Sequence, residues 1–386
     1  MKRNLICIAI TIIVMTGMTD GLTAYGIGME PEISAKAAVL VDGESGNVLF
    51  GKNIDEQMLI ASTTKIMTAL VALEHTNIDD EIEIPVEATL VEGSSMYLKA
   101  GEKYTVRDIL YGLMLVSGND AAEALAIHVA GGDEAFALLM NEKAKALGME
   151  NSSFANPHGL DDPMHYSTAR DMAVLMIGAM ENQQFREITG AKSHTVKEQT
   201  LVNHNKLLWN YEGVNGGKTG YTMAAGRTLV SSAVRDGKQL IAVTLSDPDD
   251  WKDHASLYDW GFANFEYKRI DPGKEYIRLP VISGYADSVG VAPDQEFKVL
   301  GEKDAEVSLS FELPRFVFAT VRAGDHAGRL SVMSGDAQLG SVELYYTETV
   351  ELEHGVKLSA LERLMRTFDA DGFIATEQTL MLPLPE

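Results

Sequence analysis

The sequence predicts an α/β (α+β) fold, in which helices flank an antiparallel sheet and form a block beside it, followed by a small C-terminal β-sandwich domain. Strand-like runs occur early in the chain and return at 228–234 and 240–245, while helical patterns fill the middle. Strands on both sides of a helical block indicate one sheet with helices packed on it. Beyond residue 272 short alternating runs take over, which is typical of a sandwich.

The elements of the first domain follow from the hydrophobic pattern. Ala37–Val41 is a continuous apolar run and is predicted to be a buried strand. Turn-forming residues fill Asp42–Asn47, so Val48–Phe50 is predicted to return as the hairpin partner. From Ser62 onward the pattern becomes helical, with Ser62 at the N-cap or first turn. Further helices are predicted over 105–116, 120–130, 133–147 and 167–180.

The C-terminal part divides into a sandwich and a tail. Apolar residues alternate with polar ones at Val307, Leu309, Phe311 and Leu313, which predicts a strand with one buried face. We therefore predict a catalytic domain over 30–268, a β-sandwich over 272–352 and an amphipathic helix with a tail over 353–386. The helix, drawn from Val356 to Phe368, fits two interpretations: packing on protein or a mobile tail, and peripheral contact with a membrane surface.

Length and charge restrict the class of protein. At 386 residues the chain exceeds the usual size of a single hydrophobic core, which favours two domains. Its composition, 46% hydrophobic and 23% charged, is that of a folded globular protein. The formal net charge of -24 repels phosphate backbones, so we expect no nucleic-acid partner.

The amino terminus predicts export. Lys2 and Arg3 precede an apolar run from Leu5 to Met18, and small residues follow at 24–26. This pattern is typical of a signal peptide over 1–26, with an uncleaved anchor as the alternative. We expect the protein outside the cytoplasm, in the cell wall or at the outer face of the cytoplasmic membrane. The single cysteine, Cys7, lies inside this segment, so the mature chain is expected to lack disulfides.

A Ser-x-x-Lys pattern opens the first predicted helix. Ser62 and Lys65 are three residues apart, which places both side chains on one helix face. A lysine amine in that position can accept the hydroxyl proton, provided that burial or a second cation lowers its pKa. The helix N-terminus adds backbone N–H groups and a partial positive charge where an oxyanion would form.

Two more short motifs follow in order. Ser117-Gly118-Asn119 lies between two predicted helices and offers a second hydroxyl and an amide. Lys218-Thr219-Gly220 precedes a β-like run and offers a second cation, a hydroxyl and a glycine that allows close approach to the backbone. Each motif alone is common in turns and caps, but all three in this order indicate nucleophilic serine chemistry.

Together these motifs resemble those of the penicillin-recognising serine enzymes. The surrounding sequence is similar to that of low-molecular-weight penicillin-binding proteins, the serine-type D-alanyl-D-alanine carboxypeptidases of the peptidase S11 family. The resemblance covers about residues 35–265 and continues less distinctly through the β-rich domain. Its most similar stretches are residues 60–69, 115–122, 156–160, 167–173 and 218–226.

The resemblance implies a role for each motif residue. Ser62 attacks the carbonyl of the penultimate D-Ala, Lys65 takes its proton, and Ser117 relays a proton to the leaving D-Ala. Asn119 positions the peptide, while Thr219 holds its terminal carboxylate. Lys218 keeps the field positive, Gly220 lets substrate approach, and the backbone N–H groups of Ser62 and Tyr221 form the oxyanion hole.

The resemblance also implies partners. Peptidoglycan stem peptides would be the substrates, β-lactam antibiotics would acylate Ser62, and neither a metal nor an organic cofactor would take part. Some family members bind the substrate carboxylate with an arginine that has no counterpart in the loop 247–254, which leaves Arg227, Lys252 and His254 as candidates. Two alternatives to the carboxypeptidase are a β-lactamase and a catalytically silent wall-binding protein.

Overall fold

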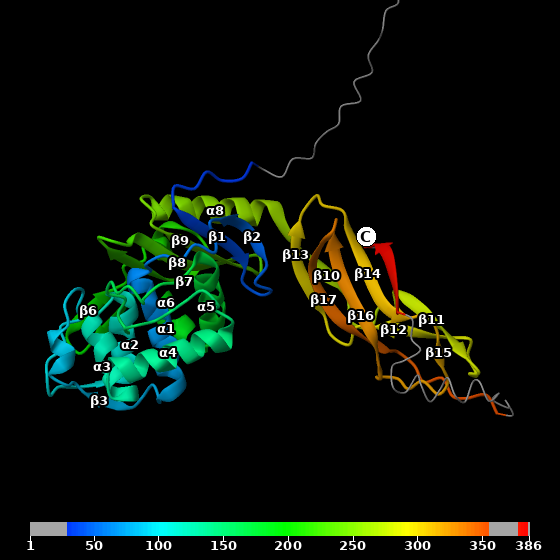
Figure 1. The fold of residues 1–386 in the computed structure, drawn as a ribbon, viewed down its shortest axis with the longest axis horizontal. Coiled ribbons are helices and arrows are strands. Elements are labelled where there is room, and N and C mark those ends of the chain that lie inside the picture. The colour runs from blue at the N-terminus through cyan, green and yellow to red at the C-terminus, as the bar shows by residue number, and fades with distance from the viewer. Residues whose placement is uncertain (1–28, 355–376, 385–386) are drawn as a thin grey trace, which may run out of the picture.

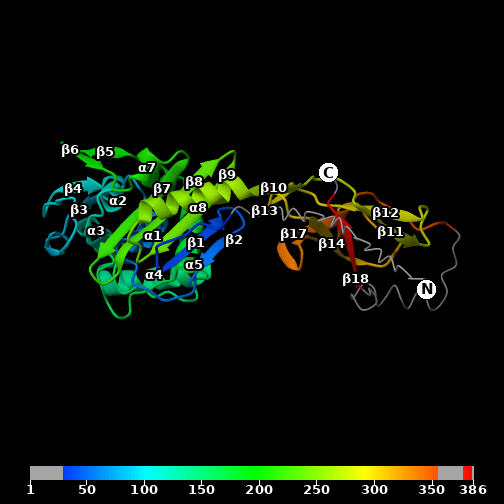
Figure 2. The same cartoon turned by 90° about the horizontal axis from the view of Figure 1, so that it is seen from above.

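The computed structural model describes residues 29–354 and 377–384 (Figure 1). A mixed helix-and-sheet domain and an all-β domain lie end to end along the long axis, as Figure 2 shows from above. The predicted signal peptide and the predicted helix Val356–Phe368 lie outside the described residues. They remain predictions, as do the domain boundaries.

The first domain is built on a five-stranded sheet with the order β2-β1-β9-β8-β7. All four strand pairs are antiparallel, and β1 pairs with β9 from the far end of the domain, Val39 opposite Val243. The predicted fold class is therefore confirmed. The strands are β1 (Ala37–Asp42), β2 (Val48–Lys52), β7 (Val214–Thr222), β8 (Gly226–Arg235) and β9 (Lys238–Leu245).

Helices cover both faces of this sheet. Val39 and Val41 pack into the core of the helical block, whereas Ala38 and Leu40 pack under α8 (Asp250–Asn264). Both faces of β1 are thus buried, which explains its continuous apolar run. The helices on the other side are α1 (Lys65–His75), α2 (Val106–Leu115), α3 (Asn119–Ala130), α4 (Asp133–Leu147), α5 (Ala169–Glu181) and α6 (Gln183–Gly190), and the short α7 (Leu207–Asn210) precedes β7.

Several sequence expectations need refinement or correction. Ser62 lies in the first turn of a short 3-10 helix, η1 (Ala61–Thr64), that runs into α1, and the N-cap of α1 is Thr64. The segment Asp250–Asn264, which was not predicted to be helical, forms α8 with two aspartates in its first turn. Lys218-Thr219-Gly220 precedes strand β8, as expected, but it also lies inside a strand of its own, β7. The glycines of β7 hide the alternation of apolar and polar residues that would predict a strand, because glycine has no side chain.

The second domain is entirely β. A seven-stranded sheet with the order β15-β11-β12-β17-β16-β14-β18 lies beside the ribbon β10–β13, and Ile270 and Val299 of that ribbon join the core that buries Leu309 and Phe311. The predicted alternation is confirmed, since Leu309, Phe311 and Leu313 are buried. The strands are β10 (Phe265–Ile270), β11 (Ile277–Ile282), β12 (Ser288–Ala292), β13 (Phe297–Glu302), β14 (Val307–Pro314), β15 (Val317–Phe318), β16 (His326–Ser334), β17 (Ala337–Tyr346) and β18 (Glu377–Pro383).

Strand β18 departs from the predicted tail. Glu377–Pro383 pairs antiparallel with β14, with Leu380 opposite Phe311. Leu380 and Leu384 pack against the core of the β domain. A run this short with a proline near its end carries little strand signal by itself, so the pairing depends on the edge that β14 offers.

Candidate functional site

Ser62 and Lys65 meet where η1 runs into α1. The Lys65 ammonium donates hydrogen bonds to Ser62 Oγ at 3.0 Å, to Asn119 Oδ1 at 2.7 Å and to the backbone carbonyl of His158 at 2.6 Å. Lys65 is fully buried, whereas Ser62 lines an open pocket. The spacing predicted one face for both side chains, and the structure places them within hydrogen-bond distance.

Burial controls the protonation of both lysines. Desolvation, followed by repulsion from Lys218, holds the pKa of Lys65 well below its usual value, and the nearby Asp120 carboxylate opposes the shift. Burial alone lowers the pKa of Lys218 to about 7. A lysine that loses its proton this readily can serve as a base near neutral pH.

The loop between α2 and α3 supplies the second motif. Ser117 has a φ of 63°, and its hydroxyl is buried without a hydrogen-bond partner among the described residues. Asn119 begins α3, and its Nδ2 donates to the Glu92 carbonyl at 2.6 Å while its Oδ1 accepts from Lys65. The amide is therefore held by a neighbouring loop with its oxygen turned toward the lysine.

The third motif lies on the sheet edge beside Ser62. A Cβ at Gly220 would stand 2.9 Å from the backbone nitrogen of Ser62 and 2.4 Å from Thr228 Oγ1, so only glycine fits there. Lys218 is buried, and its ammonium donates to the Thr219 carbonyl at 2.8 Å. Tyr221, with 65% of its surface exposed, lies at the rim of the pocket.

A pocket of about 710 Å³ joins these parts. Five of the predicted site residues line the pocket: Ser62, Ser117, Thr219, Gly220 and Tyr221. The other three, Lys65, Asn119 and Lys218, are buried and are not among its lining residues. The predicted site residues thus converge from η1, the α2–α3 loop and β7. Its remaining lining residues are Ser94, Val116, Thr200, Val202, Asn203, His204, Lys206, Arg227, Asp250 and Trp251.

Of the three candidates for carboxylate binding, only Arg227 lines the pocket. Its guanidinium donates to both carboxylate oxygens of Asp250, at 2.7 and 2.8 Å, and lies 5.6 Å from the centre of the Trp251 ring. His254 was a wrong candidate, because it is fully buried and bound to the hydroxyls of Ser231 and Thr244. Lys252 is exposed on α8 and does not line the pocket.

Sequence reasoning missed several contributors. His158 contributes through its backbone, because its carbonyl binds the lysine. Asp120 accepts hydrogen bonds from the backbone of Met96 and Leu98, which fixes the loop beside the pocket. Its position directly after Asn119 at a helix start was the available signal. His204 has no such signal, because the long-range contact of its backbone N–H with the Leu115 carbonyl places it in the pocket.

Comparison with known proteins assigns the family. The sequence model of the peptidase S11 family, described as D-alanyl-D-alanine carboxypeptidase, matches residues 26–249. A second model, described as penicillin-binding protein 5, C-terminal domain, matches residues 265–352.

Individual proteins agree with this match. The chain is 32% identical to D-alanyl-D-alanine carboxypeptidase DacF of Bacillus subtilis, over 88% of this chain and 92% of the relative. It is 37% identical to DacA of Haemophilus influenzae, over 76% of this chain and 81% of the relative. The crystal structure of penicillin binding protein 5 from Haemophilus influenzae superimposes with a TM-score of 0.73 at 32% identity, covering 83% of this chain and 98% of that one. The chain therefore belongs to the peptidase S11 family of serine-type D-alanyl-D-alanine carboxypeptidases.

Proposed function

We propose that Ser62 is the nucleophile of this D-alanyl-D-alanine carboxypeptidase and that Lys65 is its general base. The observation that carries the proposal is the buried Lys65 ammonium, 3.0 Å from Ser62 Oγ and with a lowered pKa. In its neutral form Lys65 accepts the hydroxyl proton as Ser62 Oγ bonds to the carbonyl carbon of the penultimate D-Ala. The peptide C–N bond then breaks, which leaves an ester on Ser62.

The leaving D-Ala needs a proton, and we assign its relay to Ser117. The Ser117 hydroxyl lines the same pocket as Ser62 and has no hydrogen-bond partner among the described residues. A buried hydroxyl that no protein group binds is available to hydrogen-bond a substrate group in the pocket. Water then hydrolyses the ester and restores Ser62, so the proposed steps need neither a metal nor an organic cofactor.

The third motif and Asn119 present the substrate. Asn119 would hold the peptide. Thr219 and the positive field of Lys218 would bind its terminal carboxylate, and the backbone N–H groups of Ser62 and Tyr221 would bind the oxyanion. Support comes from the close approach at Gly220, which brings β7 against the backbone of Ser62. Preorganised N–H donors at that point stabilise the charge that develops on the attacked carbonyl.

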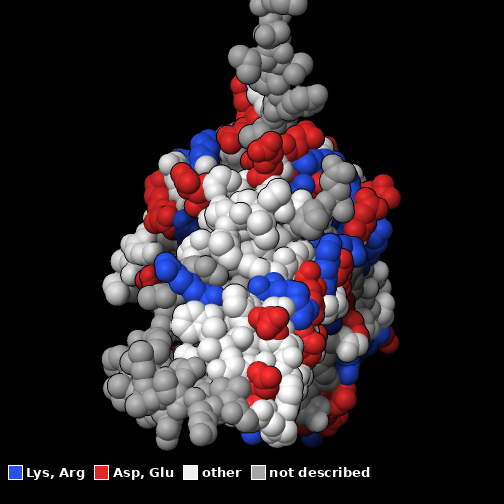
Figure 3. Space-filling model, turned by 90° about the vertical axis from the view of Figure 1, so that its right-hand side faces the viewer, with Lys and Arg blue, Asp and Glu red and all other residues white. Residues whose placement is uncertain are grey.

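The proposed substrates are peptidoglycan stem peptides that end in D-Ala-D-Ala, and β-lactams acylate the same serine. Figure 3 shows the end of the molecule that the β domain forms, where basic and acidic side chains lie among one another beside an uncharged area. On this face the mixture of both signs differs from the basic surface by which a protein binds nucleic acid.

We propose that the enzyme works outside the cytoplasm, in the cell wall or at the outer face of the cytoplasmic membrane. The basic residues and apolar run at 2–18 support export. Over the described ranges 29–354 and 377–384, no helix combines the length and apolar character that crossing a membrane requires. Peripheral membrane contact through Val356–Phe368 is a further hypothesis, tested by co-sedimentation with vesicles of a chain ending at Leu352.

The alternative of a β-lactamase has less support. Efficient class A β-lactamases activate the deacylating water with a glutamate. Among the described residues that line the pocket there is no glutamate, and the carboxylate of Asp250 is already paired with Arg227. A silent wall-binding protein is disfavoured because all three motifs converge on one pocket.

Mass spectrometry of the protein mixed with penicillin tests the assignment. We expect one covalent adduct on the tryptic peptide that contains Ser62, and D-Ala release from a pentapeptide. Ser62→Ala abolishes both, while exposed Ser193→Ala, outside the pocket lining, serves as a control. Undiminished D-Ala release by Ser62→Ala would refute the nucleophile, and rapid multiple turnover of penicillin would favour the β-lactamase.

A further inference from the structure

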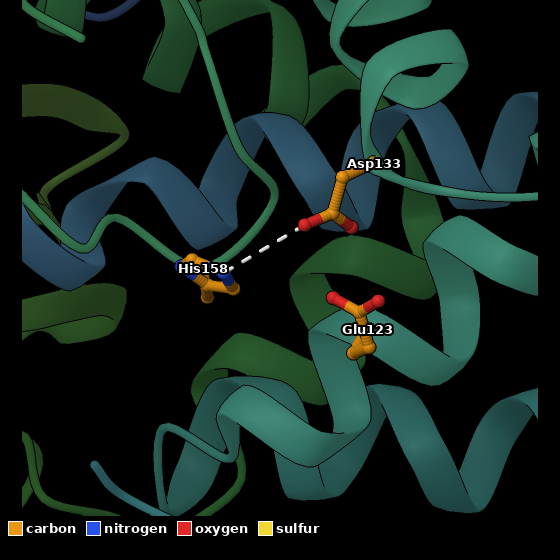
Figure 4. Close-up of side chains that lie close together, drawn as sticks. All are labelled: Glu123, Asp133 and His158. Atoms are coloured by element: carbon orange, nitrogen blue, oxygen red, sulfur yellow. Dashed lines mark ion pairs between the residues drawn. The ribbon is translucent and has the colours of Figure 1, made fainter. Parts of the chain in front are cut away.

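A half-buried cluster of ionisable side chains lies on the far side of the loop whose His158 carbonyl binds Lys65. The cluster consists of Glu123 of α3, Asp133 at the start of α4 and His158 of the α4–α5 loop. One carboxyl oxygen of each acid and one ring nitrogen of His158 lie within 4.8 Å of one another. Figure 4 shows the two carboxyl groups facing one another and the imidazole pointing at Asp133. None of the three lines the pocket, so the cluster lies outside the substrate site.

The backbone connects this cluster to Lys65. The His158 carbonyl accepts the 2.6 Å hydrogen bond from the Lys65 ammonium, and the side chain of the same residue points into the cluster. Only 9% of the His158 side chain is exposed. Whatever holds the imidazole therefore also holds the carbonyl that orients the base.

The hydrogen bonding of the His158 ring indicates whether this cluster suits a metal ion. The Leu160 backbone N–H donates to His158 Nδ1 at 3.3 Å, so Nδ1 is an acceptor. Burial, followed by repulsion from Lys65, lowers the pKa of His158 to about 3, which keeps the ring neutral. The remaining proton must then be on Nε2, which faces Asp133 Oδ2 at 3.9 Å. A nitrogen that carries a proton has no lone pair for a metal, although the residue types would suit one.

The carboxyl groups of Glu123 and Asp133 interact with each other. Glu123 Oε2 and Asp133 Oδ1 are buried and have no hydrogen-bond partner among the described residues. Burial and the neighbouring Asp133 carboxyl raise the pKa of Glu123 to about 8. At neutral pH Glu123 therefore keeps its proton, and the Asp133 carboxyl group beside it faces the Nε2–H of His158.

We propose that Glu123 and Asp133 are positioning residues, which hold the His158 ring and thereby keep its carbonyl against the Lys65 ammonium. This inference rests on the proposed role of Lys65. The pair contacts neither substrate nor Ser62 and acts through the loop alone. The charged groups that face Lys65 directly are Lys218 and Asp120, and neither belongs to the cluster.

The test compares substitutions at neighbouring positions in the first turn of α4. Asp133→Ala removes the carboxyl group that faces the imidazole, Asp133→Asn keeps an oxygen in place, and exposed Glu134→Ala is the matched control. The readout is the rate of acylation by penicillin as a function of pH. Asp133→Ala is expected to lower the maximal rate about tenfold, because a misplaced base is costly. It also moves the acid limb to lower pH, since an ammonium that loses a carbonyl acceptor gives up its proton more easily.

The control variants define the outcomes. Asp133→Asn and Glu134→Ala are expected to stay within about twofold of the wild type, because both leave an oxygen facing Nε2. A wild-type rate and pH profile for Asp133→Ala, or an equal loss in Glu134→Ala, would overturn the proposal. Absence of acylation in the wild-type protein would instead refute the proposed function, so the two failures are distinguishable.

A measurement on the wild-type protein does not depend on how any variant folds. Nitrogen-15 NMR of the histidine rings is expected to show His158 neutral and protonated on Nε2 at pH 7. A proton on Nδ1 would contradict the arrangement. Titration with ZnCl₂ completes the test: we expect no stoichiometric binding that depends on Asp133 and Glu123. Binding that Asp133→Ala and Glu123→Gln both abolish would reveal a metal site in place of a positioning pair.

Discussion

The side-chain oxygen of Asn119 accepts a 2.7 Å hydrogen bond from the Lys65 ammonium, across 54 positions of sequence. The same amide donates to the Glu92 carbonyl, so its orientation is set by protein before any substrate arrives. The lysine is thus held by an amide on one side and by the His158 carbonyl on the other. A base that is already oriented loses little freedom when it begins to act.

Lys65→Ala is expected to lower the rate of acylation by penicillin by about two to four orders of magnitude, the usual contribution of a general base. In the wild type, the rate should fall on the acid side as Lys65 becomes protonated, because the lowered pKa leaves it neutral only above that point. Stopped-flow acylation across the pH range measures both effects. Lys99→Ala, an exposed lysine, is the control, and a wild-type rate in Lys65→Ala would rule the lysine out as the base.

Lys218→Met is expected to stabilise the protein while it impairs catalysis. Burial lowers the pKa of Lys218 from 10.5 to about 7, so the unfolded chain binds a proton that the folded chain does not hold between those values. As the pH falls from 10.5 to 7, this difference reduces the free energy of unfolding, and below 7 the penalty is complete. Replacement of Lys218 by methionine removes this penalty.

The gain in melting temperature for Lys218→Met should therefore be full at pH 6 and vanish above pH 10.5. Thermal unfolding followed by circular dichroism at both values measures it. Lys252→Met, at an exposed position of α8, should leave the melting temperature unchanged. A melting temperature that falls equally at both pH values would mean that uncharged contacts of the Lys218 side chain outweigh the cost of burying its ammonium, which would contradict the prediction.

Gly220→Ala is expected to slow acylation by about two orders of magnitude with a smaller effect on folding. The new Cβ would stand 2.9 Å from the Ser62 nitrogen, so β7 and η1 must move apart at the point where the oxyanion is stabilised. Displacements of about 1 Å can cost that much in rate. Gly301→Ala in β13 meets only side-chain atoms at 3.1 Å or more, which makes it a suitable control. Equal rates for the two variants would contradict the close approach.

Arg227→Ala is expected to lower the free energy of unfolding by about 1–3 kcal/mol, because the buried Asp250 carboxylate loses both hydrogen bonds. The freed negative charge lies in the pocket, so the KM for a peptide carboxylate should rise. Chemical denaturation and steady-state kinetics measure the two effects. Arg227→Ala/Asp250→Ala is expected to recover most of the stability. A KM that stays at the wild-type value in Arg227→Ala would exclude this electrostatic effect.

Local patterns were a reliable guide to the elements. The alternation at 307–313 identified β14, and the apolar run at 37–41 identified β1. The helical periods at 133–147 and 120–130 match α4 and α3 closely. These patterns are readable because each side chain reports the environment of its own turn or strand. Where glycine or a polar surface hides the period, as in β7 and α8, the elements escaped prediction.

The sequence by itself therefore determined the strands and helices with clear periodicity, the family and the types of the reacting groups. Ser62 and Lys65 share a helix face because three residues make nearly one turn. Only the tertiary structure decided that Lys65 and Lys218 are buried and that Asn119 and the His158 carbonyl hold the base. Periodicity belongs to the local chain, whereas burial and long-range hydrogen bonds arise when β1 pairs with β9 and the helices close on the sheet.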